Sequence, residues 1–544
     1  MAHGGRRVRD TVRRTRAVER DVWYVGRPAL ALQWIRSLMT TTDFDILIIG
    51  AGPTGLAAAN EAIRHGLSVR IVDSKPHRST YSKALVVHAR TLEVFEAMGV
   101  VDAVRAAGLP FSALNVTPVV GKPSIRIDLM HLEWGDTRYP YWLSIPQYET
   151  ERCLEQHLAA QGVAVDWQMS FDGLVDHDEH GDHVAVRLVG GGRTETCRAK
   201  WLIGCDGGRS PVREAVGLGF DRSSLDETFV IADAIGSPGI PEDEGAAVLA
   251  DDGLLFVVPM PEPGRWRIIA HLAKHPPDQT VDITAEFIDR VLAARLGVSF
   301  GARDLSWTSQ FVLKQGVARR YRSGRIFIAG DAAHLHSPVG GQGLNTGVQD
   351  THALIWRIAL VERARPGVPA LLDSYEVERR ATAQAMVSGT SIATRLMTLR
   401  NGVLAALRGA VARVALRLDR VQQRLGRDVG MLELSYPESP IVIPGPRGAS
   451  GPGGRMPDPE VGGRRLCERL GARRHSVLVL DGSATGRAFA ASIAARGIHC
   501  VQVGVDEDWP DPDGALRESL GGARLVVVRP DRVIAASTTD LDAG

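Results

Sequence analysis

The stretch DILIIGAGPTGLAAANEAIRHGLSVRIVD, residues 45–73, decides how this chain folds. Residues 45–49 are a short β-branched apolar run, which is typical of a strand buried on both faces. The pattern G-x-G-x-x-G follows, then an alanine-rich segment that ends at Gly66, then a second apolar run at 69–72. This order predicts strand, tight turn, helix and strand, which is one βαβ unit of a parallel sheet.

The three glycines of this unit have different expected roles. Gly50 lets the chain turn tightly, Gly52 lets the backbone approach a pyrophosphate, and Gly55 lets the helix pack against the strand. The helix expected over 54–65 points its free N–H groups and its positive dipole end at the phosphates. Asp73 lies 23 residues after Gly50, where a carboxylate can accept hydrogen bonds from a ribose diol. The unit therefore predicts a dinucleotide site; the alternative is a purely structural turn.

Length and composition narrow the class of protein. A chain of 544 residues is too long for one core, so we expect about two to four domains. Lys+Arg 64 against Asp+Glu 63 argues against nucleic acid as a general partner. The five cysteines show no CxxC or metal spacing, which fits a reducing cytoplasm and predicts no metal site. No apolar run approaches the ~18 residues that a membrane span needs.

Residues 1–42 differ in composition from the rest, with nine arginines against three acidic residues. An arm that binds a membrane surface or nucleic acid is one interpretation. The favoured interpretation is a disordered extension, or a start assigned too far upstream, because Met39 comes just before the first strand.

Two further junctions repeat the pattern of a strand that ends in a glycine turn before a helix. The first is WLIGCDGGRSPVR at 201–213, where Asp206 makes the turn and Ser210 with Pro211 provides helix-start chemistry. The second, at 324–345, is a buried strand that ends in Gly330 and Asp331, then a loop rich in proline and glycine. A helix is expected from about 344 to 361.

Changes of pattern suggest the domain limits. Residues 220–317 are rich in strand-like runs, with one helix near 284–296, and resemble a sheet domain inserted into the first domain. Long helices are expected over 371–425, and a Pro/Gly-dense linker precedes a small α/β domain. The expected divisions are 1–42, 43–219, 220–317, 318–440 and 455–544.

The three junctions, in this order and spacing, resemble the class A flavoprotein monooxygenases that hydroxylate aromatic rings. The similarity covers about residues 43–440. The last part resembles the thioredoxin-like appendage of the phenol hydroxylase branch, with Arg455-Met456-Pro457-Asp458 at its entry and Arg529-Pro530-Asp531 near its end. The resemblance implies an α/β fold: a Rossmann-like FAD-binding domain of the glutathione reductase type, an inserted β-sheet substrate domain and a thioredoxin-like domain.

The resemblance also implies roles for single residues. Gly50, Gly52 and Gly55 would hold the FAD pyrophosphate and Asp73 the adenosine ribose. Arg90, expected just before a helix at 91–98, would contact the phosphates. Gln147, at the start of a helix over 148–161, would reach the ribityl chain. Asp331, after Gly330, would bond a ribityl hydroxyl.

The loop at 338–345 is implied to face the flavin ring. Pro338 would lie near flavin C4a, and Gly341 is the second catalytic position. Gly343, Leu344 and Asn345 would present backbone N–H groups and a helix N-terminus to the ring, which carries negative charge when reduced. His334 and His336 are interpreted as packing residues.

Asp206 and Arg209 match a motif linked to FAD and nicotinamide use. The alternative for these two residues is a structural ion pair that braces the turn.

The implied activity is hydroxylation of a phenolic or polyketide-like aromatic substrate through a flavin C4a-hydroperoxide. NADPH or NADH would reduce the FAD, and O2 would be the oxidant. A Baeyer–Villiger or epoxidising enzyme on the same scaffold, or a non-catalytic FAD-binding protein, remains open, as does a homodimer.

We predict that deletion of residues 1–38 leaves bound flavin and activity unchanged, because the fold-forming sequence begins after Met39. The measurement is the ratio of flavin to protein absorbance in the full-length and truncated chains. An insoluble or flavin-free truncated protein would show that the segment belongs to the fold.

Overall fold

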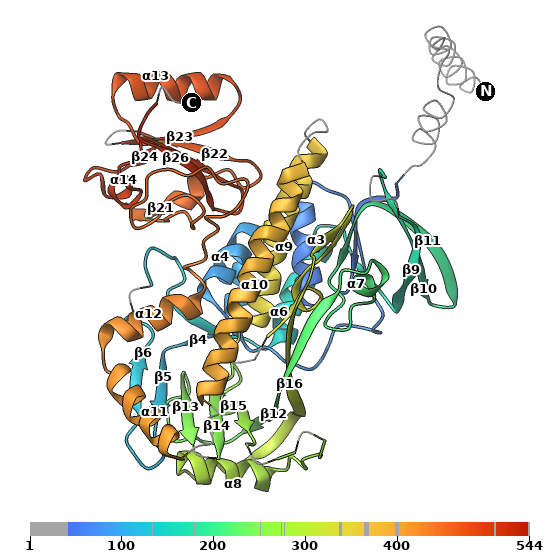
Figure 1. The fold of residues 1–544 in the computed structure, drawn as a ribbon, viewed down its shortest axis with the longest axis vertical. Coiled ribbons are helices and arrows are strands. Elements are labelled where there is room, and N and C mark those ends of the chain that lie inside the picture. Colours follow the sequence, from blue (N-terminus) through green and yellow to red (C-terminus); the bar gives the residue numbers. More distant parts are fainter. Residues whose placement is uncertain are drawn as a thin grey trace, which may run out of the picture. The chain divides into compact units, whose positions relative to one another are not determined.

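The βαβ unit forms the centre of a mostly parallel sheet (Figure 1). β1 (Phe44–Ile49) pairs in parallel with β2 (Val69–Asp73), and α3 (Pro53–Arg64) connects them. Pro53 occupies the first turn of α3, where a missing N–H costs nothing. The structure, a computed structural model, describes residues 42–541 except 133, 178–180, 251, 274, 277, 337–339, 364–368, 398–401 and 505–506. The predicted α/β class is confirmed.

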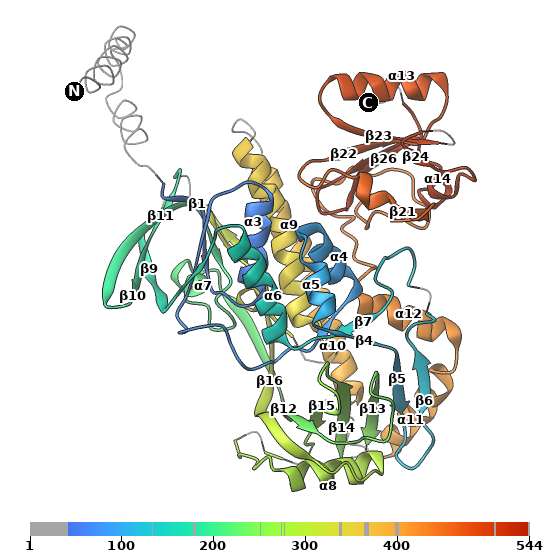
Figure 2. The same cartoon turned by 180° about the vertical axis from the view of Figure 1, so that it is seen from behind.

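Six strands of this sheet lie in the order β17-β18-β11-β1-β2-β8. The strands not yet given are β8 (Val165–Trp167), β11 (Arg193–Gly204), β17 (Arg322–Ser323) and β18 (Ile326–Ile328). β11 extends beyond the sheet and forms antiparallel pairs with β10 (Val184–Gly190), which in turn pairs with β9 (Met169–His177). α3 packs against β1 and β2 and against α9 (Gly343–Arg363), as both ribbon views show (Figures 1 and 2).

A second sheet of eight strands lies below the first in Figure 1. Five of its strands fall in the expected region: β12 (Phe220–Ile235), β13 (Glu244–Ala250), β14 (Gly253–Pro259), β15 (Arg265–His271) and β16 (Arg303–Ala318). α8 (Ala285–Leu296) covers one of its faces through Ile288 and Leu292. The sheet also takes in β5 (Ala113–Thr117), β6 (Ile125–Asp128) and β19 (His334–Leu335), because β5 pairs with β13 and β19 with β16. It therefore draws on sequence outside the expected limits of 220–317.

A small sheet, β3-β7-β4, stands beside the first helices. Its strands are β3 (Val86–Val87), β4 (Leu109–Phe111) and β7 (Trp142–Ser144). α4 (Ala89–Met98) starts two residues earlier than predicted, because the extended His88 is its N-cap. Arg90 therefore lies inside the first turn. α6 (Gln147–Ala160) likewise begins at Gln147.

Helices fill the region after α9, where long helices were expected over 371–425: α10 (Pro369–Met397), α11 (Gly402–Ala415) and α12 (Asp419–Gly430). None of the described helices is both long and apolar enough to cross a membrane.

The last part of the chain has its own mixed sheet, in the order β24-β23-β22-β25-β26. Its elements are β22 (Ser476–Val479), α13 (Ala484–Ala495), β23 (His499–Gly504), β24 (Trp509–Pro510), β25 (Leu525–Val528) and β26 (Ile534–Thr538). β22 pairs in parallel with β23 and antiparallel with β25. The thioredoxin-like resemblance stays a prediction. Burial raises the pKa of Cys467 to about 12, so this thiol is a poor nucleophile.

A buried ionic network fastens this last part to α9 and α10. Arg529 donates to both carboxylate oxygens of Glu378 on α10, at 2.7 and 3.0 Å, and to Asp531 Oδ1 at 2.9 Å. Trp356 Nε1 on α9 donates to Asp531 Oδ2 at 3.0 Å. Burial would raise the pKa of Glu378, but Arg357 and Arg529 outweigh it, so its pKa lies below the ordinary range. The Arg529-Pro530-Asp531 motif is thus a docking element.

We expect Arg529→Met to cost about 3–5 kcal/mol, because it leaves Glu378 and Asp531 buried with one cation fewer. The measurement is the urea midpoint of unfolding, with exposed Arg496→Met as the matched control. Equal midpoints for the two variants would show that the network does not hold this part in place.

Candidate active site

The three predicted junctions meet at one edge of the first sheet. The parallel register sets Ile49 beside Gly204 and Gly204 beside Ile328, so β1, β11 and β18 end level. The chain beyond the strands stays paired, with Cys205 N donating to Ile49 O at 2.8 Å and Ala329 N donating to Gly204 O at 3.0 Å. Gly50, Asp206 and Gly330 are therefore neighbours, although they lie far apart in sequence. Ligands of open α/β sheets bind at such carboxyl-end edges.

The glycine turn leaves space where a phosphate is expected. A Cβ atom on Gly50, whose φ is +101°, would lie 2.4 Å from Cys205 O, and one on Gly55 would lie 1.8 Å from Gly50 O. These two glycines are required by close backbone packing. A Cβ atom on Gly52 would meet nothing within 4 Å. Gly52 is the N-cap of α3 and has no side-chain cap, so the helix N-terminus faces this open space.

Asp73 braces the turn. Its Oδ2 accepts from Ala51 N at 2.8 Å and its Oδ1 from Lys75 N at 2.9 Å. A carboxylate has about four acceptor positions, so both oxygens retain capacity for a ribose diol.

Asp206 does not form the ion pair with Arg209 that was the alternative interpretation, as far as the described residues show. Asp206 Oδ2 accepts from Val212 N at 3.0 Å, while Arg209 is exposed. Asp206 Oδ1 is buried and has no hydrogen-bond partner among the described residues, and burial raises the pKa of this carboxyl. Such an unmatched acceptor fits a ligand donor.

Arg213 is a site residue to which the sequence gave no role. Its guanidinium donates to Ala332 O at 2.7 Å and to Gly208 O at 3.0 Å, which ties the second junction to the third. Its position after the Ser210 cap places it in α7 (Pro211–Ala215), but Ala332 lies 119 residues away, so this bond could not be inferred from the sequence.

The third junction turns at Gly330, with φ of +63°. Gly330 N donates to Asp350 Oδ2 at 3.0 Å, and Asp350 also accepts from Arg379 Nε at 2.7 Å. His334 Nε2 lies 2.7 Å from Asp350 Oδ2, so His334 is a buried partner of Asp350 rather than a general packing residue. Asp350 thus fixes the turn from inside.

Asp331 takes no part in the hydrogen bonds of this cluster that the described residues show. Its side chain is exposed, no described residue bonds it, and the surrounding protein raises its pKa by desolvation. The group is available to a ligand hydroxyl.

Hydrogen bonds of Asn345 and His88 hold the loop before α9 in position. Asn345 Oδ1 accepts from His88 N at 2.9 Å, and Asn345 Nδ2 donates to Val86 O and Gly341 O at 2.9 and 2.8 Å. His88 Nε2 lies 2.8 Å from Gly340 O, and burial lowers the pKa of His88 to about 4. The Asn345 side chain is therefore structural, while α9 begins at Gly343 and Leu344 with its N-terminus at the loop. Pro338 lies outside the described residues.

Two of the predicted FAD contacts, Arg90 and Gln147, already form hydrogen bonds within the protein. Arg90 donates to Glu93 Oε2 and to Asp531 O, both at 2.7 Å. A phosphate contact from Arg90 would have to share or break these bonds. Gln147 donates to Glu151 Oε1 at 2.8 Å and accepts from Ala84 N at 3.2 Å. Its partial exposure leaves it within reach of a ligand.

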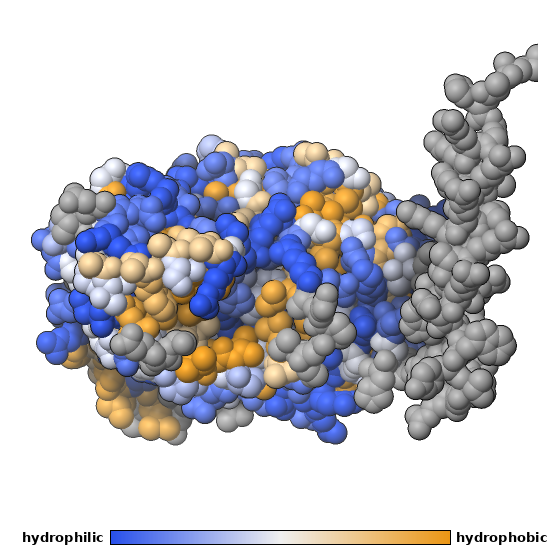
Figure 3. Space-filling view, turned by 90° about the horizontal axis from the view of Figure 1, so that it is seen from above, coloured by the Kyte–Doolittle hydropathy of each residue, from blue (hydrophilic) through white to orange (hydrophobic). Residues whose placement is uncertain are grey.

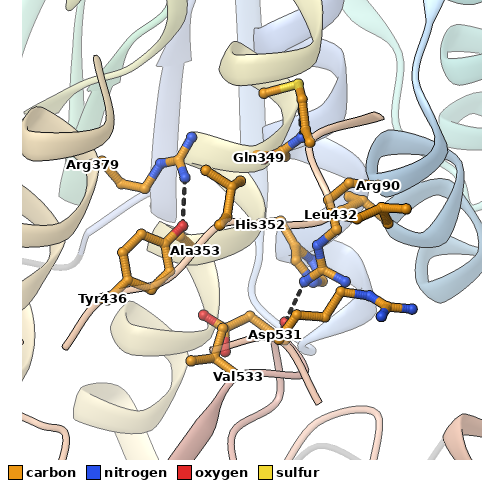
Figure 4. Close-up of a pocket in the computed structure, with 13 residues that line it drawn as sticks. Arg90, Gln349, His352, Ala353, Arg379, Leu432, Tyr436, Asp531 and Val533 are labelled. Atoms are coloured by element: carbon orange, nitrogen blue, oxygen red, sulfur yellow. Dashed lines mark hydrogen bonds between the residues drawn. The ribbon is translucent and has the colours of Figure 1, made fainter. Parts of the chain in front are cut away.

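A cavity between α4, α9 and the last part of the chain is drawn in Figure 4. Arg90 alone among the predicted site residues lines it, beside side chains that include His352, Arg379 and Tyr436. It contains none of the three glycine junctions, so it is not the expected flavin site. A metal site is also unsupported, since the described residues hold no group of three or more His, Cys, Asp or Glu side chains that could bind one.

The second sheet offers an aromatic face away from α8. Phe229 stacks on His271 at 4.9 Å and on Phe311 at 5.7 Å between ring centroids. The buried pair Arg267–Asp233, at 2.7 Å, sits over Trp307 and donates to Lys83 O, which joins this face to the first domain. Trp266 packs under α8 and is core.

We predict that Gly52→Ala weakens FAD binding by about tenfold, roughly one lost hydrogen bond, while the apoprotein keeps its stability. Gly482→Ala is the matched control, because a Cβ atom there also meets nothing within 4 Å. Titration of apoprotein with FAD, followed by fluorescence quenching, measures both. Unchanged FAD affinity in Gly52→Ala would mean that the open space at Gly52 is not the phosphate site.

The chain is similar to known FAD-binding proteins and monooxygenases. Residues 43–390 match the FAD binding domain family. The 6-methylpretetramide 4-monooxygenase of Streptomyces rimosus is 36% identical in an alignment 517 residues long, which covers 90% of this chain and 90% of that protein. The solved anhydrotetracycline hydroxylase OxyS of Streptomyces rimosus covers 91% of this chain and 95% of its own, with a TM-score of 0.70 and 28% identity. A solved Diels–Alderase from pyrroindomycin biosynthesis covers 90% and 96%, with a TM-score of 0.68 and 26% identity.

The family match spans more than half of the chain, and the identity to a monooxygenase spans nine tenths of it. The chain therefore belongs to the FAD-binding family of FAD-dependent aromatic monooxygenases.

Proposed function

We propose that the chain hydroxylates a polycyclic, polyketide-type aromatic compound at the edge where β1, β11 and β18 end. The observation that supports the proposal most is that these three strands end at the same level, next to the open space at Gly52. The relatives named for 6-methylpretetramide and anhydrotetracycline support the ring class. NADH or NADPH is the expected reductant and O2 the oxidant.

Bound FAD supplies hydride acceptance and the activation of oxygen. Gly52 and the first turn of α3 bind its pyrophosphate, with Gly50 and Gly55 shaping the turn. Asp73 keeps this turn in place and accepts from the adenosine ribose. Asp331 accepts from a ribityl hydroxyl, and a charged acceptor of this kind contributes roughly 1.5–3 kcal/mol.

The loop and the N-terminus of α9 face the flavin ring in this proposal. Backbone N–H groups at Gly341, Gly343 and Leu344 stabilise negative charge there, aided by the helix dipole. Asn345, bonded to Val86 and His88, holds these donors so that they need little rearrangement during the reaction. In the same proposal Pro338 lies near flavin C4a, and Gln147 contacts the ribityl chain, as the sequence predicted.

The substrate face is the side of the second sheet away from α8. Half-buried Phe256 and Phe311 provide flat apolar surface there, and the Arg267–Asp233 pair is fully satisfied. Such a surface excludes water from an aromatic ring and fixes its orientation.

Nicotinamide has no second fingerprint of its own in the sequence. Asp206 and Arg209 are the candidates for linking flavin and nicotinamide, since Asp206 Oδ1 is unmatched and Arg209 is exposed. The glycines of the loop at 340–343 allow the small movements that would couple reduction to substrate occupancy.

The remaining assignments complete the proposal. We place the protein in the cytoplasm, because its five cysteines are all free thiols. The domain limits, the thioredoxin-like character of residues 455–544 and a homodimer belong to the same proposal. The similarity to a Diels–Alderase supports one alternative function, in which the protein binds FAD and shapes a substrate without oxidising it.

We expect a polycyclic phenol to gain one oxygen atom and to accelerate flavin reduction by NAD(P)H by orders of magnitude. Product mass and anaerobic stopped-flow absorbance, with and without substrate, measure the two effects. A monocyclic phenol is the matched control for ring class.

Two outcomes identify alternative functions, and a third tests the coupling. Oxygen inserted into a ring C–C bond indicates Baeyer–Villiger chemistry. A rearranged product of unchanged mass, formed without NAD(P)H, indicates the non-oxidative function. Equal reduction rates with and without substrate refute the coupling but leave hydroxylation intact.

A further inference from the structure

The last part of the chain contains none of the residues assigned to FAD, yet it forms a buried interface with α4. The face seen from above in Figure 3, at the end where Figure 1 draws α13, mixes hydrophilic and hydrophobic residues. The buried contacts of this part indicate its role more clearly. Arg455 and Arg532 each bond a glutamate of α4, and the backbone of Asp531 accepts from Arg90 in the first turn of the same helix.

Glu93, in the second turn of α4, is the centre of this interface. Its Oε2 accepts from Arg90 Nη1 at 2.7 Å and from Arg455 Nε at 3.0 Å. Its Oε1 accepts from Arg455 Nη2 at 2.5 Å and from Thr137 Oγ1 at 2.8 Å. These bonds fill the acceptor capacity of a carboxylate, which is about four. Burial would raise the pKa of Glu93, but Arg455 and Arg90 outweigh it, so its pKa lies below the ordinary range.

Arg90 connects the same cluster to the backbone of the last part. Figure 4 shows its guanidinium joined to Asp531 by a dashed line, which is the bond from Arg90 Nη2 to Asp531 O at 2.7 Å. The Asp531 carboxylate is itself fixed, because it accepts from Arg529 Nε at 2.9 Å and from Trp356 Nε1 of α9 at 3.0 Å. The first turn of α4 is therefore anchored to a residue that is held in place.

The residue just before α4 bonds the loop that is proposed to face the flavin ring. We call residues 340–345 the flavin loop. His88, the N-cap of α4, donates from its N to Asn345 Oδ1 at 2.9 Å, and its Nε2 lies 2.8 Å from Gly340 O. A carbonyl oxygen only accepts, so Nε2 carries the proton of this ring. α4 thus contacts the last part through its first two turns and the flavin loop through its N-cap.

α4 is short and tightly packed. Eight of its ten residues are buried. Glu93 follows His88 by five residues, which is about 7.5 Å along a helix axis. Close-packed interiors transmit small displacements, so a shift at Glu93 also shifts His88 and its two bonds to the flavin loop.

We propose that the last part of the chain positions the flavin loop through α4, with Glu93 as the positioning residue that joins them. This inference rests on the proposed function in one respect, since it takes the loop to face the flavin ring. The competing explanation is that apolar packing alone holds α4, through fully buried residues such as Leu92 and Phe95. In that case the loop does not respond when the charge of Glu93 is lost.

Hydrogen exchange of the full-length protein without FAD, followed by mass spectrometry, tests the link from α4 to the loop directly. The variants are Glu93→Gln and Arg455→Met, the second of which changes only the last part. The amide of Thr346 donates to Gln342 O at 2.9 Å, so its protection reports on the loop. We expect the peptide that contains Thr346 to exchange at least about fivefold faster in both variants.

Glu468→Gln is the matched control. Glu468 also belongs to the last part, but it pairs with Arg138 rather than with α4, and its side chain is 42% exposed. The amides of β1, which pair with β2 and β11, are the internal reference and should exchange at an unchanged rate in every variant. Melting temperature confirms that each variant is folded.

The FAD-loaded protein gives a second readout. A displaced loop moves its N–H donors relative to the ring, so the visible circular dichroism and the reduction midpoint potential of the flavin should change in Glu93→Gln and Arg455→Met. Glu468→Gln should match the wild type. The double variant of Glu93 and Arg455 should show no larger change than either single variant, because both substitutions break the same link.

Unchanged exchange at Thr346 in both variants overturns the proposal in favour of packing alone. Tighter FAD binding by Glu93→Gln than by the wild type also overturns it, because released Arg90 would then be a phosphate contact. Faster exchange at Thr346 with an unchanged flavin spectrum and potential supports the link to the loop and refutes the proposed function instead.

Discussion

The level parallel pairing of β1, β11 and β18 is the constraint on which the rest of the structure depends. Parallel strands end at the same edge, so pairing Ile49 with Gly204 and Gly204 with Ile328 brings three distant turns together. A register shift of one residue on β11 would move Asp206 by about one strand rise, roughly 3.3 Å. The glycines are then required by close packing, since a Cβ atom on Gly50 would lie 2.4 Å from Cys205 O and one on Gly330 would lie 2.5 Å from Thr54 Oγ1.

Buried charge holds the turns and the last part of the chain in position. The Asp350 carboxylate accepts from Gly330 N and Arg379 and lies against His334. Glu378, which is on the same helix as Arg379, binds Arg529. Such groups are costly to bury and stay stable only when each carries its full set of partners. The site edge and the docking of the last part thus share α10.

Local signals predicted the parts of the site that depend on neighbouring residues. The order of strand, glycine turn and helix gave the position of α3 to within one residue, and the second sheet was anticipated from its strand-like runs. Residues whose work depends on distant partners were not found. Arg213, Asp350, His88 and Glu378 bond atoms from other parts of the chain. Arg90 was predicted as a site residue, but its hydrogen bond to Asp531 O, 441 residues away, was not. The joining of β5 to β13 was missed for the same reason.

The most direct test of the central claim is a crystal structure of the protein with FAD. The account predicts the pyrophosphate against the backbone of Gly52 and the first turn of α3, a ribityl hydroxyl on Asp331, and the ring at the N-terminus of α9. FAD phosphates bound elsewhere, for example beside Arg90 in the cavity of Figure 4, would contradict it.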